Sequence, residues 1–273
     1  LLRGLSTMSG DQTCPSGPAG RPWPLAMSWP DLLFPHWPLP PEALRPLLPR
    51  TRPPLELEIR EGAAWLGVVP FRMSGLRFRR LPPMPGTTAF PELNVRTYVT
   101  AGGRPGVWFF SLDAASPLAV RVARATFHLP YFDATMRCAA EGEAVRYHSR
   151  RTHAGGGRAE LAATYRPSGP VGRSAPGSLE HWLTERYRLF VADRHGRLWR
   201  GGKPPQTPPP PPPPAGLCAP RHGRLWRGEI HHEPWPLQPA AAEFAALDMT
   251  RWLGLELPAG RRLEVRAARL VRA

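Results

Sequence analysis

Four polar side chains, spaced two residues apart along one short segment, are the best candidates for chemistry: Glu92, Asn94, Arg96 and Tyr98. Segment 92–99 is rich in β-branched and aromatic residues, which predicts a strand. Side chains alternate between the faces of a strand, so these four share one face. The flanking strand candidates, 68–73 and 107–112, are apolar and predict an interior position in a sheet. Because unpaired buried charge is costly, the polar face is expected to line a concave pocket near Tyr131 or His231.

Arginine side chains give this pocket its expected ligand class. Arg72, Arg96 and Arg186 can clamp a carboxylate, because one guanidinium binds both carboxylate oxygens. The competing interpretation is an ordinary ion pair, for example Arg96 with Glu92. A small anionic molecule is therefore the expected ligand.

A second polar group lies near the end of the chain. Glu229 and His231 share one face of the strand predicted at 225–232, and both are candidate ligand contacts. Together with Glu92 they can ligate zinc or iron. No third histidine occurs at an informative spacing, so a structural hydrogen-bond cluster is favoured. We expect neither a metal nor another cofactor.

Ser111 and Asp113 share a face of the strand at 107–112, where a Ser/His/Asp triad can be imagined. The chain has no Gly-x-Ser-x-Gly elbow to position such a serine. Ser111 is kept as a ligand contact of the pocket, not as a nucleophile.

The elements that position these residues follow from alternation, caps and turns. Further strands are predicted at 55–60, 64–73, 134–140, 144–150, 158–165, 187–192 and 263–270, with a hairpin turn at 102–106. Short helices are predicted after Pro40, after Ser116, after Ser178 and at 249–253. Segment 29–38 is expected to be irregular, and 241–247 is open between helix and strand. The apolar face of the second helix is predicted to contain Leu118, Ala119, Val122, Ala123, Ala125 and Thr126.

These elements predict one mainly β, α+β domain at 28–273. Residues 1–27 are rich in Gly, Pro and Ser and predict a disordered tail. The octapeptide at 194–201 recurs unchanged at 221–228, and an unbroken proline run lies between the copies. We interpret 194–220 as a proline-rich duplicated insert in a hairpin. Proline follows the first copy closely, so the second copy is expected to pair with the strand at 187–192.

Composition excludes several classes of partner. The chain has 273 residues and a net charge of +15, but its arginines are dispersed and Lys203 is its one lysine. Nucleic-acid binding is therefore not expected, because its footprint is a clustered basic patch. No apolar run approaches the ~18 residues of a membrane span. The three cysteines are far apart, which fits a reducing cytoplasm. A homo-oligomer is compatible with the sequence.

Six segments carry a resemblance to a known family: 31–38 (DLLFPHWP), 64–73 (AWLGVVPFRM), 92–99 (ELNVRTYV), 106–114 (GVWFFSLDA), 127–131 (FHLPY) and 228–239 (GEIHHEPWPLQP). They resemble the YqjF-like family of uncharacterised bacterial proteins over about residues 28–270. That family is similar in fold to acetoacetate decarboxylase. The resemblance implies an antiparallel, cone-shaped β-barrel with a few short helices.

The same resemblance bears on the chemistry. Acetoacetate decarboxylases form a Schiff base through a lysine that follows a proline. Here Pro130 matches that proline, and Tyr131 and Phe132 stand where the lysines would be. Neither side chain can form an imine, and Lys203 lies in the insert. The resemblance therefore implies a pocket without Schiff-base decarboxylation, with Tyr131 among its ligand contacts.

Two function hypotheses remain. The first is a non-catalytic protein that binds a small anion. The second is a lyase or hydrolase that uses Glu92 or His231 as its acid or base. A strongly shifted pKa at either residue in a closed pocket favours the enzyme, whereas arginines and aromatics without a base favour the binder.

Overall fold

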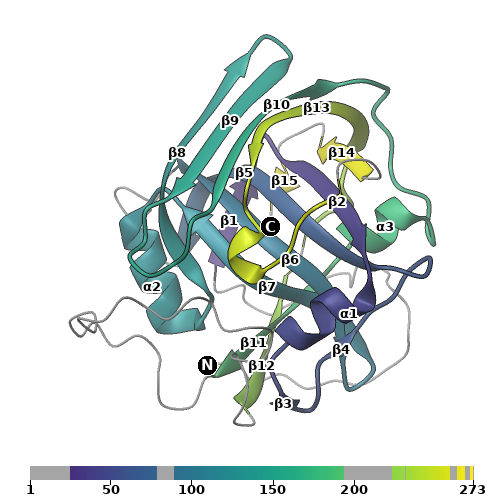
Figure 1. Ribbon diagram of the computed structural model, residues 1–273. Helices are drawn as coiled ribbons and strands as arrows, with labels where there is room; N and C mark the ends of the chain where they lie inside the picture. The colour runs from purple at the N-terminus through teal and green to yellow at the C-terminus, as the bar shows by residue number, and fades with distance from the viewer. Residues whose placement is uncertain are drawn as a thin grey trace.

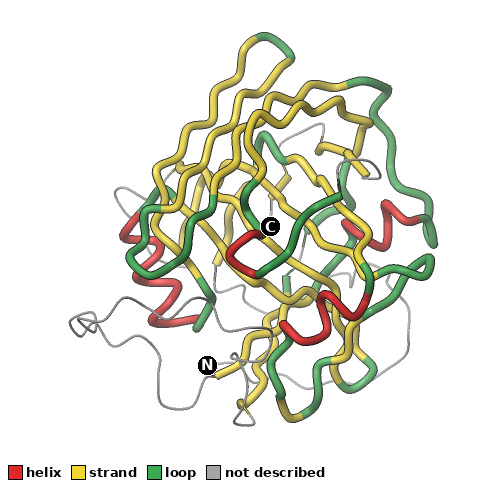
Figure 2. The backbone as a smooth tube through the Cα atoms, in the orientation of Figure 1, coloured by secondary structure: helices red, strands yellow, loops and turns green. Residues whose placement is uncertain are grey.

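The computed structural model describes residues 25–78, 89–193, 223–230, 232–258, 263–267 and 271–272. The strands are β1 Leu25–Trp29, β2 Leu33–Leu39, β3 Thr51–Arg52, β4 Glu56–Leu57, β5 Ala64–Phe78, β6 Ala89–Ala101, β7 Arg104–Ala114, β8 Tyr131–Glu141, β9 Ala144–Arg151, β10 Glu160–Pro167, β11 Arg188–Asp193, β12 Gly223–Glu229, β13 Leu237–Leu247, β14 Leu263–Ala267 and β15 Val271–Arg272. The helices are α1 Pro41–Leu44, α2 Pro117–Phe127 and α3 Leu179–Thr184, with 3-10 turns at Arg45–Leu47 and Arg251–Leu253. Figure 2 shows the short helices at the periphery of an assembly made mainly of strands.

The strands form one large mixed sheet (Figure 1). Strand β6 lies between β5 and β7, and β8, β9, β10 and β13 follow β7 as antiparallel neighbours of one another. The prediction of a mainly β chain with few short helices is confirmed. The sheet is mixed and not antiparallel throughout, because β7 runs parallel to both β8 and β11, and β12 runs parallel to β3. The crossover through α2 from β7 to β8 produces the first of these parallel pairs.

The central hairpin has the geometry that its sequence predicts. Strands β6 and β7 pair from Glu92↔Ala114 to Ala101↔Arg104. Gly102 and Gly103 form the turn with φ of 56° and 71°, a left-handed conformation that glycine adopts without steric cost. The interior position predicted for segment 92–99 is therefore confirmed.

The two faces of β6 contact different cores. The alternate residues Leu93 and Val95 are fully buried and belong to one core with residues of β9 and β10, including Tyr147 and Leu161. A second core on the other side joins β1, β2 and β5 to α2 and to Trp235. The polar face of β6 lies on this second side, where α2 and α3 are found.

Both serine caps are confirmed. The Ser116 hydroxyl accepts a hydrogen bond from the Ala119 N–H, and the Ser178 hydroxyl accepts one from His181 N–H. The predicted apolar face of α2 is partly wrong. Ala119 and Val120 are its buried residues, whereas Leu118 is 42% exposed. The helix contacts the sheet along a narrower and rotated stripe.

Several boundaries need correction. Residues 25–27, assigned to the tail, belong to β1, and Leu33–Leu39 is a strand despite its prolines. Ala241–Leu247, left open, lies in β13. The helix predicted at 249–253 is a 3-10 turn at Arg251–Leu253, closed by Gly254 at φ 73°. The strand predicted at 55–60 is reduced to Glu56–Leu57.

Most of the second octapeptide copy lies in strand β12 of the sheet. Strand β12 pairs with β11 from Arg188↔Glu229 to Asp193↔Arg224, which confirms the prediction. The first copy and the proline run lie outside the described residues. Within the described part of the chain, none of the helices has the length and apolarity of a membrane span.

Candidate functional site

The polar face of β6 is buried over its whole length. Glu92, Asn94, Arg96 and Tyr98 are exposed by 2, 6, 9 and 0%. The ion pair considered between Glu92 and Arg96 does not form. Residues four apart on a strand are separated by about 13 Å, and the two side chains have different partners.

Glu92 forms a pair with Tyr131, the first residue of β8. The Tyr131 hydroxyl lies 3.1 Å from each carboxyl oxygen of Glu92. Burial raises the pKa of the Glu92 carboxyl group to about 8, although the hydrogen bond from Tyr131 opposes the shift. Glu92 is therefore mostly protonated at neutral pH and contributes little negative charge to this face.

Arg96 carries a buried positive charge. Its Nη2 donates to the Leu183 carbonyl at 3.2 Å, and its guanidinium carbon lies 5.4 Å from the Phe34 ring centre. Its Nε has no acceptor, and no carboxylate of the described residues pairs with it. Two residues away on the same face, Asn94 Oδ1 has no donor among the described residues. The neighbourhood of Arg96 thus contains a cation and an amide with unused hydrogen-bonding capacity.

His36 and Tyr98 form the next layer of this face. His36 Nδ1 lies 3.0 Å from the Phe34 carbonyl, so that nitrogen carries the proton. The Tyr98 hydroxyl lies 2.6 Å from His36 Nε2 and 2.7 Å from the Leu183 carbonyl. Burial first, and then Arg96, holds the pKa of His36 well below its usual value. Since His36 is neutral, the single phenol proton is shared between two acceptors, and Arg96 is not offset by any neighbour in this layer.

The predicted arginine clamp forms only in part. Arg96 and Arg186 lie 5.7 and 4.8 Å from the Tyr98 ring centre. Arg186 already pairs with Glu58 at 2.9 Å. Arg72 is separate, because it pairs with Asp31 at 2.7 Å and its side chain is 43% exposed.

Ser111 lies on the opposite face of the sheet. It pairs with Val95, and Asp113 pairs with Leu93, so both residues of β7 face the first core. Asp113 binds Arg151 of β9 through two bonds of 2.6 and 2.7 Å, and both side chains are fully buried. A salt bridge therefore occupies the position where a Ser/His/Asp triad was imagined.

Of the predicted pair Glu229 and His231, the structure describes Glu229 alone. Glu229 is 44% exposed in its side chain and lies 3.3 Å from Arg227. His231 lies outside the described residues. Its neighbour His232, which the sequence did not single out, is buried, and its ring lies 4.5 Å from Tyr187 and 4.6 Å from Trp235. Burial lowers the pKa of His232. Among the described residues no group of three His, Cys, Asp or Glu side chains is arranged to hold a metal.

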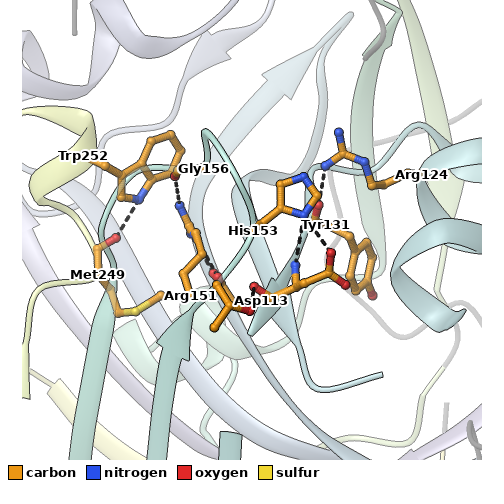
Figure 3. Close-up of polar contacts among 10 residues, drawn as sticks. Asp113, Arg124, Tyr131, Arg151, His153, Gly156, Met249 and Trp252 are labelled. Carbon is orange, nitrogen blue, oxygen red and sulfur yellow. Dashed lines mark hydrogen bonds and ion pairs between the residues drawn. The ribbon is translucent and has the colours of Figure 1, made fainter. Parts of the chain in front are cut away.

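A second polar region, also missed by the sequence, lies at the loop between β9 and β10. His153 Nδ1 lies 2.9 Å from Asp133 Oδ2, and Arg151 Nη1 donates to the Gly156 carbonyl at 2.7 Å (Figure 3). An open depression of about 650 Å³ is lined by this loop. The signal that could have found it is the sequence Thr-His-Ala-Gly-Gly-Gly-Arg at 152–158, too long and too glycine-rich for a simple hairpin turn.

A family model described as uncharacterized conserved protein, DUF2071, matches residues 26–202. The chain belongs to the DUF2071 family. It is 41% identical over 236 residues to the uncharacterized protein YqjF of Bacillus subtilis (strain 168), covering 86% of this chain and 84% of that one. The resemblance read from the six segments is thereby confirmed.

Solved structures of proteins with low sequence identity to this chain share its fold. The enduracididine biosynthesis enzyme MppR, complexed with the condensation product of pyruvate and imidazole 4-carboxaldehyde, superposes with a TM-score of 0.55 at 14% identity, covering 98% of this chain and 94% of that one. Acetoacetate decarboxylase from Legionella pneumophila superposes with a TM-score of 0.53 at 14% identity over the same shares of both chains. The family member described here therefore has an acetoacetate decarboxylase-like fold.

Proposed function

We propose that this DUF2071 protein binds a small carboxylate against Arg96, on the buried polar face of β6, without forming a Schiff base. The single observation that carries the proposal is the uncompensated guanidinium. A cation buried without a counter-ion is expensive, and a carboxylate that accepts bonds from Nε and Nη would supply the missing charge and the missing acceptor.

The surrounding groups favour an anion. His36 is neutral because its pKa is depressed, and Glu92 is mostly protonated because its pKa is raised to about 8. The aromatic rings of Phe34 and Tyr98 flank the guanidinium and hold it in place. An incoming carboxylate therefore meets the positive charge of Arg96, which neither His36 nor Glu92 offsets, while the nearby Arg186 is already paired with Glu58.

The ligand enters by displacing α3. The Leu183 carbonyl accepts from both Arg96 and Tyr98, so it occupies the position where a carboxylate oxygen would bind. Movement of this six-residue helix releases one acceptor, and the ligand replaces it.

The chemistry of the fold's neighbours supports the ligand class. MppR has been solved with pyruvate, at a TM-score of 0.54 and 13% identity, and acetoacetate decarboxylase is named for an oxo acid. We infer a small oxo acid as the ligand.

We also infer a closed barrel. The strand pairings form a cycle that returns to its starting strand: β5–β2, β2–β14, β14–β13, β13–β10, β10–β9, β9–β8, β8–β7, β7–β6 and β6–β5.

Schiff-base chemistry is not part of the proposal. An imine needs a primary amine, and Lys203, the one lysine of this sequence, is far in sequence from Tyr131 and Phe132. After incubation with pyruvate or acetoacetate and borohydride, we expect no mass increase of the protein. A stable adduct would contradict this part of the proposal.

Arg96→Met tests the binding site. If Arg96 is kept for a ligand, the substitution removes an uncompensated buried charge, so the ligand-free melting temperature stays equal or rises while stabilisation by pyruvate or acetoacetate is lost. Arg146→Ala, at a 67% exposed side chain on β9, is the matched control and should retain the ligand response. Melting that falls in Arg96→Met, with no oxo acid stabilising the wild type, would show that Arg96 is purely structural.

A second function is favoured by one observation, the raised pKa of Glu92. A carboxyl group with a pKa of about 8 beside the Tyr131 phenol can donate or accept a proton near neutral pH. On that alternative the protein is a lyase or hydrolase acting on the same ligand. Turnover of an oxo acid by the wild type, lost in Glu92→Gln while binding persists, would select the enzyme over the binder.

A further inference from the structure

A second surface of the molecule has the composition of an anion site and shares no residue with the face around Arg96. It is the open depression at the β9–β10 loop, about 650 Å³ in volume. Arg150, Arg151, His153, Arg158 and Glu160 provide its charged and titratable side chains. Arg150 and Arg158 are exposed. Arg158 Nη2 lies 3.7 Å from Glu160 Oε2, so a ligand competes with this carboxylate for Arg158.

The loop is held rigidly at its base. The Thr152 and His153 N–H groups both donate to the Asp133 carbonyl, at 2.9 and 3.1 Å. Gly156 lies so close to Arg151 and Phe132 that a Cβ there would stand 2.9 Å from each side chain. A loop fixed in this way presents a preformed surface, which lowers the entropic cost of binding.

The floor of the depression is a neutralised arginine. The Arg151 guanidinium is bound by Asp113 and lies between two rings, 4.1 Å from the centre of Phe132 and 4.9 Å from that of Trp252 (Figure 3 shows the arginine with Asp113 and Trp252). Asp113 balances the positive charge of Arg151, so the role of Arg151 is to hold the neighbouring groups in place. The charge that attracts a ligand comes from Arg150 and Arg158 at the rim.

The histidine is oriented by an acid. His153 Nδ1 lies 2.9 Å from Asp133 Oδ2 but 3.4 Å from the Asp133 N–H, so the shorter contact makes Nδ1 the donor to the carboxylate. The second ring nitrogen, Nε2, is then left for a ligand. The ring is fixed against Phe132 in an edge-to-face arrangement with centres 5.5 Å apart.

The backbone adds further donors. Gly155 and Gly157 both have φ of 73°, and their N–H groups have no backbone acceptor among the described residues. Backbone N–H groups in turn conformations of this kind are donors in anion-binding nests, while the Gly156 N–H between them donates to the His153 carbonyl. A Cβ at Gly157 would stand 2.9 Å from Trp252 Cβ, so this position also needs glycine for packing.

We propose that this depression binds the terminal phosphate group of a small molecule. A phosphate group has several oxygens, which can accept hydrogen bonds from two arginine side chains and from backbone N–H groups at the same time. Its second pKa lies at about 6, so its protonated form is present near neutral pH and can donate a hydrogen bond to His153 Nε2. A carboxylate lacks the third oxygen and the second titration.

The test uses the intact protein and inorganic phosphate as the probe, with binding followed by isothermal titration calorimetry at constant ionic strength. We expect saturable binding by the wild type in the millimolar range or tighter. Arg150→Ala combined with Arg158→Ala should weaken it about tenfold or more, and His153→Gln should weaken it severalfold. Arg146→Ala, an equally exposed arginine on β9 outside the depression, should leave affinity unchanged.

Two further arms identify the source of the phosphate. A phosphomonoester such as phenyl phosphate should bind at least as tightly as inorganic phosphate, and a short oligothymidylate without terminal phosphates should bind more weakly. Absence of saturable phosphate binding, an equal loss in Arg146→Ala, or tighter binding of the oligonucleotide would each overturn the proposal. Because Arg96 and Glu92 take no part, these outcomes are independent of the oxo-acid proposal.

Discussion

The Tyr131 hydroxyl lies 3.1 Å from both oxygens of the Glu92 carboxyl group, and the two residues come from β8 and β6. Both side chains are buried, at 9 and 2% exposure. Burial of Glu92 couples its protonation to the folded state, and the contact with Tyr131 opposes part of this effect. The pKa of about 8 in the folded protein exceeds the ordinary value of 4.5.

Glu92→Gln should therefore change how stability depends on pH. In the wild type, the contribution of Glu92 is fully present below pH 4.5 and is lost as the pH rises through 8, because the unfolded chain ionises first. The loss is at most about 1.4 kcal/mol per pH unit within that window. Glutamine mimics the protonated acid, so the variant should gain stability over the wild type as the pH rises. Urea unfolding at several pH values measures the difference, and Glu56→Gln at an exposed site is the control. A difference that does not vary with pH would contradict the raised pKa.

Tyr131→Phe should raise the pKa of Glu92 further. The hydrogen bond from Tyr131 stabilises the carboxylate and opposes the effect of burial. Its loss leaves a buried carboxyl group with one fewer partner and should cost about 1–3 kcal/mol of unfolding free energy. The carboxyl carbon of Glu92, followed by NMR through a pH titration, reports the pKa directly. A lower pKa in the variant would show that another group controls this acid.

The Asp113–Arg151 salt bridge should behave as a buried pair. Asp113→Asn leaves the fully buried Arg151 without its counter-ion and should cost about 3–5 kcal/mol. The double variant Asp113→Leu, Arg151→Met removes both charges and should recover most of that loss. Chemical denaturation of Asp113→Leu, of Arg151→Met and of the double variant gives the coupling energy. A double variant less stable than both single variants would mean that the pair also has a role in packing or ligand binding.

Deletion of residues 194–220 should leave the fold intact. The deletion joins Asp193 to Arg221 and keeps the copy that supplies β12. Closure entropy grows by only about 0.6 kcal/mol per doubling of loop length, so a small gain in stability is expected. Circular dichroism and the melting temperature measure the outcome. Deletion of residues 221–228 instead is the matched comparison and should be strongly destabilising, because it removes the paired strand.

The sequence by itself determined the elements that depend on local backbone chemistry. Gly102 and Gly103 give the β6–β7 turn because only residues that tolerate positive φ fit there. Ser116 and Ser178 start α2 and α3 because each hydroxyl satisfies an N–H that the helix leaves open. Proline follows the first octapeptide copy and cannot donate a backbone hydrogen bond, so the second copy was predicted to continue as a strand. Strand β12 contains most of that second copy.

Only the tertiary structure decided how those elements use their side chains. The alternation of β6 showed which residues share a face, but that face is covered by α3, whose Leu183 lies 85 residues beyond Tyr98 in the sequence. Likewise the prolines of segment 29–38 predicted irregular structure, yet Leu33–Leu39 is a strand because it pairs with β5 on one side and β14 on the other. Burial, the charge of Glu92 and the partner of Arg96 depend on contacts between segments distant in sequence, and local patterns carry no record of those distances.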